Sequence, residues 1–356
     1  MAQVVGGGST LPRNLYNDVL TASPLPGFNT YIGVGSDDGK RAFFTNDGAL
    51  FNAPGATVDY VGSDSLVNAT EAQNYADNDE LAFGPLIQIP SVLTSVTVPY
   101  NITGISNLNL TSAQVASVIA DPAIVRWNQV PGFESLPNSR MIKVIYRSEG
   151  SGTTEVFLRH LNAVNSTLVP SVSNTFSSVI DVSNTNKYIS VEGSQGMVDG
   201  LAGNVDSIGY VSPDYTDEGN NAVVARVNGL LPTQINPQAV IEAVPVPSTA
   251  VQRRDPLAWG ISNPNPSRGY PIVGSTNLIL SQCYQSATDN ARIRDALNKL
   301  YGTAGTWDSQ ITAHGFIPLP AAWKTAIHQT FWNQADSLEL AVGDPTECTP
   351  GRGRPQ

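Results

Sequence analysis

The sequence predicts an α/β protein with two domains and mostly parallel sheets. Short β-rich runs lead four times into loops of small polar residues, and helical periods follow. Strands that alternate with helices form parallel sheets covered on both faces. The length of 356 residues favours two domains over one, because a typical domain has roughly 150 residues. Two apolar extended stretches, 91–100 and 269–281, divide the chain and predict where it crosses to the second domain and returns.

The first two strands are expected near the N-terminus. Residues 3–5 run into the glycine-rich loop 6–10, and apolar residues then repeat at every fourth position behind Pro12. Proline suits the first turn of a helix, because its missing N–H would be unpaired there anyway. Residues 30–34 form the second expected strand, which runs into the polar loop 35–39.

The third and fourth strands end in polar loops of the same kind. Residues 58–61 run into 62–65, and residues 142–146 run into 147–154, after which apolar residues keep helical spacing to Val164. In open α/β sheets, ligands lie beyond the carboxyl ends of the strands. All four polar loops are expected there.

The crossing stretches make domain one discontinuous. We expect domain one to comprise 1–97 plus 269–356 and domain two to comprise 98–268. At the C-terminus we expect a helix over 289–301, a helix or loop after it, and a last helix near 321–335.

The composition excludes several classes of partner. The chain has 19 Lys and Arg against 30 Asp and Glu, a net charge of −11. It therefore lacks the basic surface that binding to nucleic acid or to an anionic membrane requires. No run approaches the ~18 consecutive apolar residues of a membrane span. No leader precedes Ala2, which indicates a cytosolic or an already processed protein. Only 14% of residues are charged, which suits an exported protein.

The two cysteines, Cys283 and Cys348, have neither CxxC spacing nor a nearby pair of histidines, which argues against zinc. In an exported protein they would most simply pair and close a loop of about 66 residues, worth roughly 4 kcal/mol on the chain-entropy model. Two buried free thiols are the alternative, because the sequence does not show the redox compartment.

Two loops carry the physical requirements of an anion site. Residues 6–12 place flexible backbone and two hydroxyls before a helix start, where free N–H groups and the helix dipole favour negative charge. Such a loop alone is equally a helix cap with a turn. Residues 150–154 repeat the pattern next to Arg147, and arginine binds a phosphate-like group bidentately. The two loops together favour an anion ligand.

Enzyme signatures are weak. The histidines at 160, 314 and 328 lie far apart, and His160 falls at a core-like helical position. No Gly-x-Ser-x-Gly elbow occurs. Residues 33–39 have one residue too many for the dinucleotide fingerprint. We expect no catalytic residue, no metal and no cofactor.

Eight segments spread over nearly the whole chain are typical of one protein family. They are Gly6–Pro12, Tyr31–Ser36, Gly62–Ser65, Ser151–Glu155 behind Arg147, Gly209–Asp214, Gly269–Ile272, Ser281–Tyr284 and Gly351–Gln356. Through them the sequence resembles the DING proteins, a phosphate-binding branch related to the periplasmic phosphate-binding proteins of bacterial phosphate ABC transporters. The opening Asp-Ile-Asn-Gly of that family is replaced by residues 2–6. Many members have a second disulfide, but the matching positions in this sequence, near Ala116 and Asn165, are not cysteines.

The resemblance implies a two-domain, periplasmic-binding-protein-like type II fold, with mixed, mostly parallel sheets flanked by helices and a ligand cleft between the domains. It implies high-affinity binding of inorganic phosphate by hinge closure, and pairing of the two cysteines. The phosphate-binding residues that it implies are Thr10, Leu11 through its N–H, Ser36, Asp64, Arg147, Ser151, Gly152 and Thr153.

Asp64 is the unusual member of this set. A carboxylate repels a dianion unless the ligand donates a proton to it, which hydrogen phosphate can do and sulfate at neutral pH cannot. We therefore expect Asp64 to select phosphate over sulfate. The alternative is that Asp64 caps a helix behind residues 62–63.

The resemblance also implies a periplasmic or secreted monomer, with a phosphate ABC transporter permease as a further partner and no membrane insertion. Two other functions stay open: a phosphatase that acts on phosphate esters, and an extracellular interaction or adhesion protein that retains phosphate. A hydrolase needs a nucleophile or a metal-bound water, and the candidate hydroxyls have no adjacent base in sequence.

Overall fold

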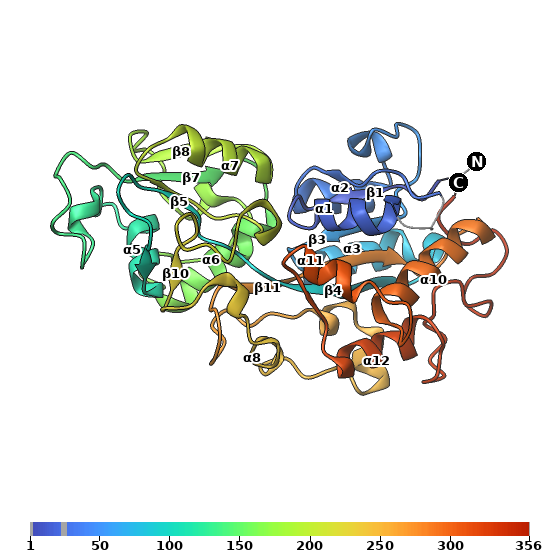
Figure 1. Ribbon diagram of the computed structural model, residues 1–356. Coiled ribbons are helices and arrows are strands. Elements are labelled where there is room, and N and C mark those ends of the chain that lie inside the picture. The colour runs from blue at the N-terminus through green and yellow to red at the C-terminus, as the bar shows by residue number, and fades with distance from the viewer. Residues whose placement is uncertain (1–2, 23–26, 356) are drawn as a thin grey trace. The chain divides into compact units, whose positions relative to one another are not determined.

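The computed structural model describes residues 3–22 and 27–355 (Figure 1). Ala2, in the altered opening segment, and Gln356, at the end of the last family motif, lie outside the described residues. The chain splits into two compact units. Unit 1 comprises Met1–Leu93, Val244–Ile261 and Ser275–Gln356, and unit 2 comprises Thr94–Ala243 and Ser262–Gly274.

Residues 244–261 belong to unit 1, although we expected them in domain two. The buried Trp259 explains the difference, because its ring packs edge-on against Phe331 at 5.1 Å and Trp323 at 6.3 Å between ring centroids. Burying a tryptophan of this size contributes a large share of local stability. Domain bounds at 97/98 and 268/269 stay a prediction.

Unit 1 is built on a six-stranded mixed sheet. In spatial order its strands are β12 (Ile317–Pro318), β4 (Leu86–Ser95), β11 (Val273–Ser281), β3 (Tyr60–Ser63), β1 (Gly6–Gly8) and β2 (Ile32–Gly33). Strand β1 lies parallel to both β2 and β3, whereas β11 is antiparallel to β3 and β12 is antiparallel to β4. The three parallel strands end at one edge, where the polar loops follow.

The first strand lies later than expected, at Gly6–Gly8 instead of 3–5. A Cβ atom built on Gly6 would lie 2.1 Å from the ring of Tyr60. Tight packing here therefore requires glycine, and the pairing of Gly6–Gly8 with β2 and β3 overrides the β-propensity of the valines before them.

The helices of unit 1 cover the sheet and its ends. Their bounds are α1 Arg13–Tyr16, continued by a π-helical segment Asn17–Ala22, α2 Ser36–Thr45, α3 Ala69–Asn78, α4 Glu80–Phe83, α9 Ala250–Arg254, α10 Ala287–Tyr301, α11 Asp308–Ala313 and α12 Ala321–Phe331. Helix α12 ends four residues earlier than expected. Gln334 and Ser337 adopt left-handed φ angles of 55° and 57°, which an α-helix cannot include.

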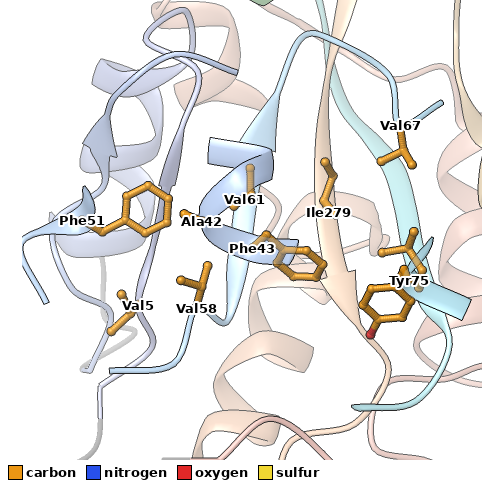
Figure 2. Packing of buried hydrophobic residues seen from close by; sticks show 10 residues of the cluster. Val5, Ala42, Phe43, Phe51, Val58, Val61, Val67, Tyr75 and Ile279 are labelled. Atoms are coloured by element: carbon orange, nitrogen blue, oxygen red, sulfur yellow. The ribbon is translucent and has the colours of Figure 1, made fainter. Parts of the chain in front are cut away.

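A cluster of buried apolar side chains holds α2 and α3 against the sheet. Figure 2 shows Phe43 of α2 beside Tyr75 of α3, and their rings stack with centroids 6.1 Å apart. The cluster comprises Val5, Ala42, Phe43, Phe51, Val58, Val61, Val67, Tyr75, Leu86 and Ile279. Each fully buried aliphatic or aromatic side chain of this kind contributes about 1.5–3 kcal/mol. The core thus supports the helix start and the strand ends that carry the candidate residues.

Unit 2 contains a four-stranded sheet and a two-stranded one. The larger sheet has the order β5 (Tyr100–Asn101), β9 (Ser207–Ile208), β7 (Lys143–Arg147), β8 (Tyr188–Val191), and the smaller one pairs β6 (Asn109–Leu110) with β10 (Arg226–Val227). The helices are α5 Ser112–Ala120, α6 Gly152–Val164, α7 Gly193–Gly203 and α8 Pro237–Ile241. Strand β7 is parallel to β8 and β9, and α7 packs on β7 and β8 (Figure 1).

Short 3₁₀ turns connect several of these elements. They are Gly48–Phe51, Trp127–Gln129, Phe176–Ser178, Pro213–Tyr215, Pro232–Gln234 and Pro256–Trp259. No helix in residues 3–22 and 27–355 combines the length and the apolar character needed to cross a bilayer.

His160 connects α5 to α6. These helices contain or adjoin Ala116 and Asn165, the positions where many family members have a second disulfide. Its Nε2 lies 2.9 Å from the hydroxyl of Ser112, and its Nδ1 lies 2.8 Å from the carbonyl oxygen of Pro264. Burial lowers the pKa of His160, so the neutral ring is favoured. The core position expected for His160 is confirmed, and one hydrogen bond joins the two helices where a disulfide is absent.

Cys283 and Cys348 form a disulfide with a Cα–Cα distance of 5.3 Å, which excludes the alternative of two free thiols. Thiol counting on protein unfolded without reductant should therefore find no reactive thiol. The same protein unfolded after reduction serves as the control and should show two. Two reactive thiols in the oxidised sample would contradict the pairing.

Candidate functional site

The predicted site residues form two clusters, one in each unit. The unit 1 cluster is Thr10, Leu11, Ser36 and Asp64, and all four are buried. Thr10 and Leu11 follow β1, Ser36 begins α2 behind β2, and Asp64 follows β3. Because β1, β2 and β3 are parallel neighbours, their carboxyl ends bring these residues together.

Ser36 is positioned by a glycine turn. Gly35 adopts a φ of 95°, which side chains other than glycine rarely tolerate, and its N–H donates to the carbonyl oxygen of Gly8 at 2.9 Å. The Ser36 hydroxyl accepts a hydrogen bond from the backbone N–H of Asp64 at 3.1 Å. The positive end of the α2 dipole thus lies at this cluster.

Asp64 accepts hydrogen bonds from two hydroxyls. The Ser9 hydroxyl donates to Oδ2 at 2.5 Å, and the Thr276 hydroxyl donates to Oδ1 at 2.8 Å. The Ser9 Oγ also accepts from the N–H of Leu11 at 3.1 Å. Asp64 does not cap the following helix, because the N-cap of α3 is Asn68. The helix-cap alternative for Asp64 is therefore wrong.

The unit 2 cluster is Arg147, Ser151, Gly152 and Thr153, also buried. Arg147 ends β7, and the other three begin the 13-residue helix α6. The Ser151 hydroxyl accepts from the N–H of Thr154 at 3.3 Å, which makes Ser151 the N-cap. The loop therefore presents hydroxyls at the positive end of a helix dipole next to a guanidinium.

Glu149 holds the guanidinium of Arg147. Nε of Arg147 donates to Oε1 of Glu149 at 2.6 Å, Nη2 donates to the same oxygen, and the backbone N–H of Gly193 donates to it at 3.1 Å. Among the described residues, Nη1 of Arg147 has no hydrogen-bond partner. Glu149 therefore orients the guanidinium and leaves donor capacity for another acceptor.

The hydroxyl of Tyr210 supports this cluster through two hydrogen bonds. Its hydroxyl accepts from the N–H of Arg147 at 3.2 Å and lies 2.7 Å from the hydroxyl of Thr154. Burial raises the pKa of Tyr210 to about 12, so the phenol stays neutral at physiological pH. Tyr210 thereby holds the end of β7 and the start of α6 close together.

Each cluster thus offers hydroxyl and N–H donors at a helix start. One cluster adds a carboxylate and the other a guanidinium. Within the described part of the chain, His, Cys, Asp and Glu form no group of three or more that could hold a metal ion. Such donor sets suit a tetrahedral oxyanion.

Comparisons with known proteins agree with this arrangement. A family model described as the PBP superfamily domain matches residues 1–293. A solved structure described as a high-affinity periplasmic phosphate-binding protein (PfluDING) bound with phosphate has a TM-score of 0.89 and 38% identity, covering 99% of both chains. This chain belongs to the DING branch of the PBP superfamily. The resemblance read from the eight segments is confirmed, and so is the type II fold class.

Other relatives of this DING-type chain carry two different names. "Alkaline phosphatase L" of Pseudomonas aeruginosa is 42% identical over 99% of this chain and 94% of its own length. A "Phosphate-binding protein" from an unknown prokaryotic organism is 37% identical over 99% of each. A crystal structure described as a DING protein matches with a TM-score of 0.87 and 37% identity, over 99% of this chain and all of its own.

Sequence reasoning missed three residues of these clusters. Ser9 was visible as a hydroxyl in the glycine loop, but its bond to Asp64 was not. Glu149 is two residues from Arg147, where an acidic neighbour could have suggested the pair. Thr276 left no local signal, because it is 212 residues from Asp64 and reaches it only through the pairing of β11 with β3.

Proposed function

We propose that this DING-type chain binds inorganic phosphate with high affinity, and that both clusters contribute donors to one phosphate. The observation that carries the proposal is that each unit buries hydroxyl and N–H donors at the start of a long helix, and one of them adds Arg147. The phosphate bound in the PfluDING structure supports the same ligand.

The proposed mechanism is hinge closure. Ligand contacts from both units are complete only in the closed form, so phosphate shifts the population toward it. We assign Thr10, Leu11, Ser36 and Asp64 to one side of the ligand, and Arg147, Ser151, Gly152 and Thr153 to the other. Hydroxyls and backbone N–H groups would make nearly all contacts, with Arg147 as the cation.

Replacing Arg147 by Ala tests the proposal. The variant should lose about 1.5–3 kcal/mol or more of binding free energy, because a charged hydrogen bond to the anion disappears, which corresponds to roughly 10- to 150-fold in Kd. Titration calorimetry with inorganic phosphate measures the change. Arg140 is the matched control, since it also pairs with an acid in unit 2, at 3.0 Å to Asp206, and lies in neither cluster. Unchanged affinity in Arg147→Ala would overturn the site.

A second candidate function is phosphatase activity, which the name of the relative from Pseudomonas aeruginosa favours. Release of phosphate from a chromogenic phosphate ester, with and without a chelator, distinguishes the two functions. Turnover by the parent that is lost in Arg147→Ala would support a phosphatase. Tight phosphate binding without turnover would support the binding function.

We further propose that the protein is a periplasmic or secreted monomer that delivers phosphate to an ABC transporter permease. PfluDING is a periplasmic phosphate-binding protein, which supports the location. Fractionation of cells that express the complete gene, followed by light scattering on the purified chain, tests location and oligomeric state. Cytoplasmic recovery would contradict the first and a dimer the second.

A further inference from the structure

Two hydroxyls hold the carboxylate of Asp64, one on each oxygen. Ser9 and Thr276 are the donors, and all three residues are at least 98% buried, with 2%, 0% and 2% exposure for Ser9, Thr276 and Asp64. An ionised carboxylate can accept about four hydrogen bonds, two at each oxygen. The two hydroxyls therefore each fill one acceptor position, one on Oδ1 and one on Oδ2.

The hydrogen bonding of Ser9 and the strand position of Thr276 explain why both hydroxyls donate to Asp64. The Oγ of Ser9 already accepts from the N–H of Leu11, so its own proton is available for Asp64. Thr276 lies within β11, whose residue Asn277 pairs with Ser63 directly before Asp64. The amide of Asn277 also donates to the carbonyl oxygen of Ser63 at 3.1 Å. Strand register thus places the Thr276 hydroxyl at the carboxylate.

Asp59 is a second buried carboxylate, with different hydrogen-bond donors, and it shows how burial changes a carboxylate pKa. It lies in the same unit at 3% exposure and accepts from the N–H of Val5 at 2.7 Å. Burial raises the pKa of Asp59 to about 7, so this side chain is partly protonated near neutral pH. Hydrogen bonds to the charged form oppose this effect of burial.

We propose that Ser9 and Thr276 are positioning residues that keep Asp64 ionised and fix its acceptor direction, so that the site selects oxyanions that carry a proton. The proposal rests on the proposed function. An ionised, oriented Asp64 can only accept, so a bound anion must donate to it. A protonated Asp64 could instead donate to sulfate, and a rotated Asp64 would no longer face the proton of the ligand, so selectivity would fall in either case.

Three substitutions test the proposal. Thr276→Val and Ser9→Ala each remove one hydroxyl, and Thr276→Ser keeps it. Labelled phosphate measures Kd, and competition with sulfate measures the ratio of the two affinities. We expect the ratio to fall by at least about tenfold in Thr276→Val and in Ser9→Ala, the scale of one lost hydrogen bond to a charged group. Thr276→Ser should restore it to within about threefold of the parent.

Thr330 supplies the matched control. Its buried hydroxyl donates to Oδ2 of Asp336 at 2.7 Å, the same kind of contact in the same unit. Thr330→Val should lower stability by a similar amount and leave the phosphate-to-sulfate ratio unchanged. This variant separates loss of fold from loss of selectivity.

The outcomes distinguish failure of the proposed function from failure of the role assigned to Ser9 and Thr276. A parent protein that does not bind phosphate overturns the proposed function. A parent that binds phosphate and excludes sulfate, with Thr276→Val and Ser9→Ala equally selective, overturns only the role of the two hydroxyls. Equal loss of both anions without rescue by Thr276→Ser shows a structural role and also overturns it. If Thr276→Val does not fold, Ser9→Ala decides.

Discussion

The Asp64→Asn variant should lose orders of magnitude of its discrimination between phosphate and sulfate. In the parent, sulfate leaves a buried acceptor unpaired and adds like-charge repulsion, and sites of this kind reject an analogue without the donor by roughly 10⁴-fold or more. The amide of asparagine can donate to sulfate, so both penalties shrink. Competition of sulfate against labelled phosphate measures the change.

Asp59→Asn is the control for this experiment. Asp59 is a second buried aspartate of unit 1, and its carboxylate accepts from the N–H of Val5. The Asp59→Asn variant should keep the parent's discrimination, because Asp59 belongs to neither cluster. An Asp64→Asn variant that still excludes sulfate as strongly as the parent would refute the role of Asp64.

The Arg354→Ala variant should lower the free energy of unfolding of unit 1 by about 4–5 kcal/mol, because several buried acceptors lose a charged donor at once. The guanidinium of Arg354 donates to Ser281 Oγ, Asn46 Oδ1 and Val58 O, each at 2.7 Å, and lies 3.8 Å from the ring centroid of Phe43. Arg354 is 2% exposed, so water cannot replace these bonds. Urea denaturation monitored by tryptophan fluorescence measures the loss.

Arg352 provides the comparison for Arg354. Its side chain pairs with Glu347 near the surface, with 20% and 34% of the two side chains exposed. Arg352→Ala should cost clearly less, because solvent reaches the groups that it leaves. Equal destabilisation by the two substitutions would mean that the C-terminal segment contributes through its backbone and not through the buried guanidinium.

The candidate loops could be predicted because their chemistry is local. Glycine before Ser36, and a hydroxyl residue directly before α6 at Ser151, are preferences that act within a few residues. The same local reasoning placed Arg147 beside the α6 loop. Strand bounds were less predictable, since β1 occupies Gly6–Gly8 and not the valine-rich 3–5. There the pairing of Gly6–Gly8 with β2 and β3 outweighs intrinsic propensity.

The sequence by itself determined the α/β class, the polar loops beyond the strands, the core position of His160 and, through its resemblance, the family. Only the tertiary structure decided the partners of the charged groups. Thr276 reaches Asp64 because β11 pairs antiparallel with β3, and residues 244–261 join unit 1 because Trp259 is buried there. Propensities and caps act over a few residues, whereas strand register and core packing depend on segments about 200 residues apart.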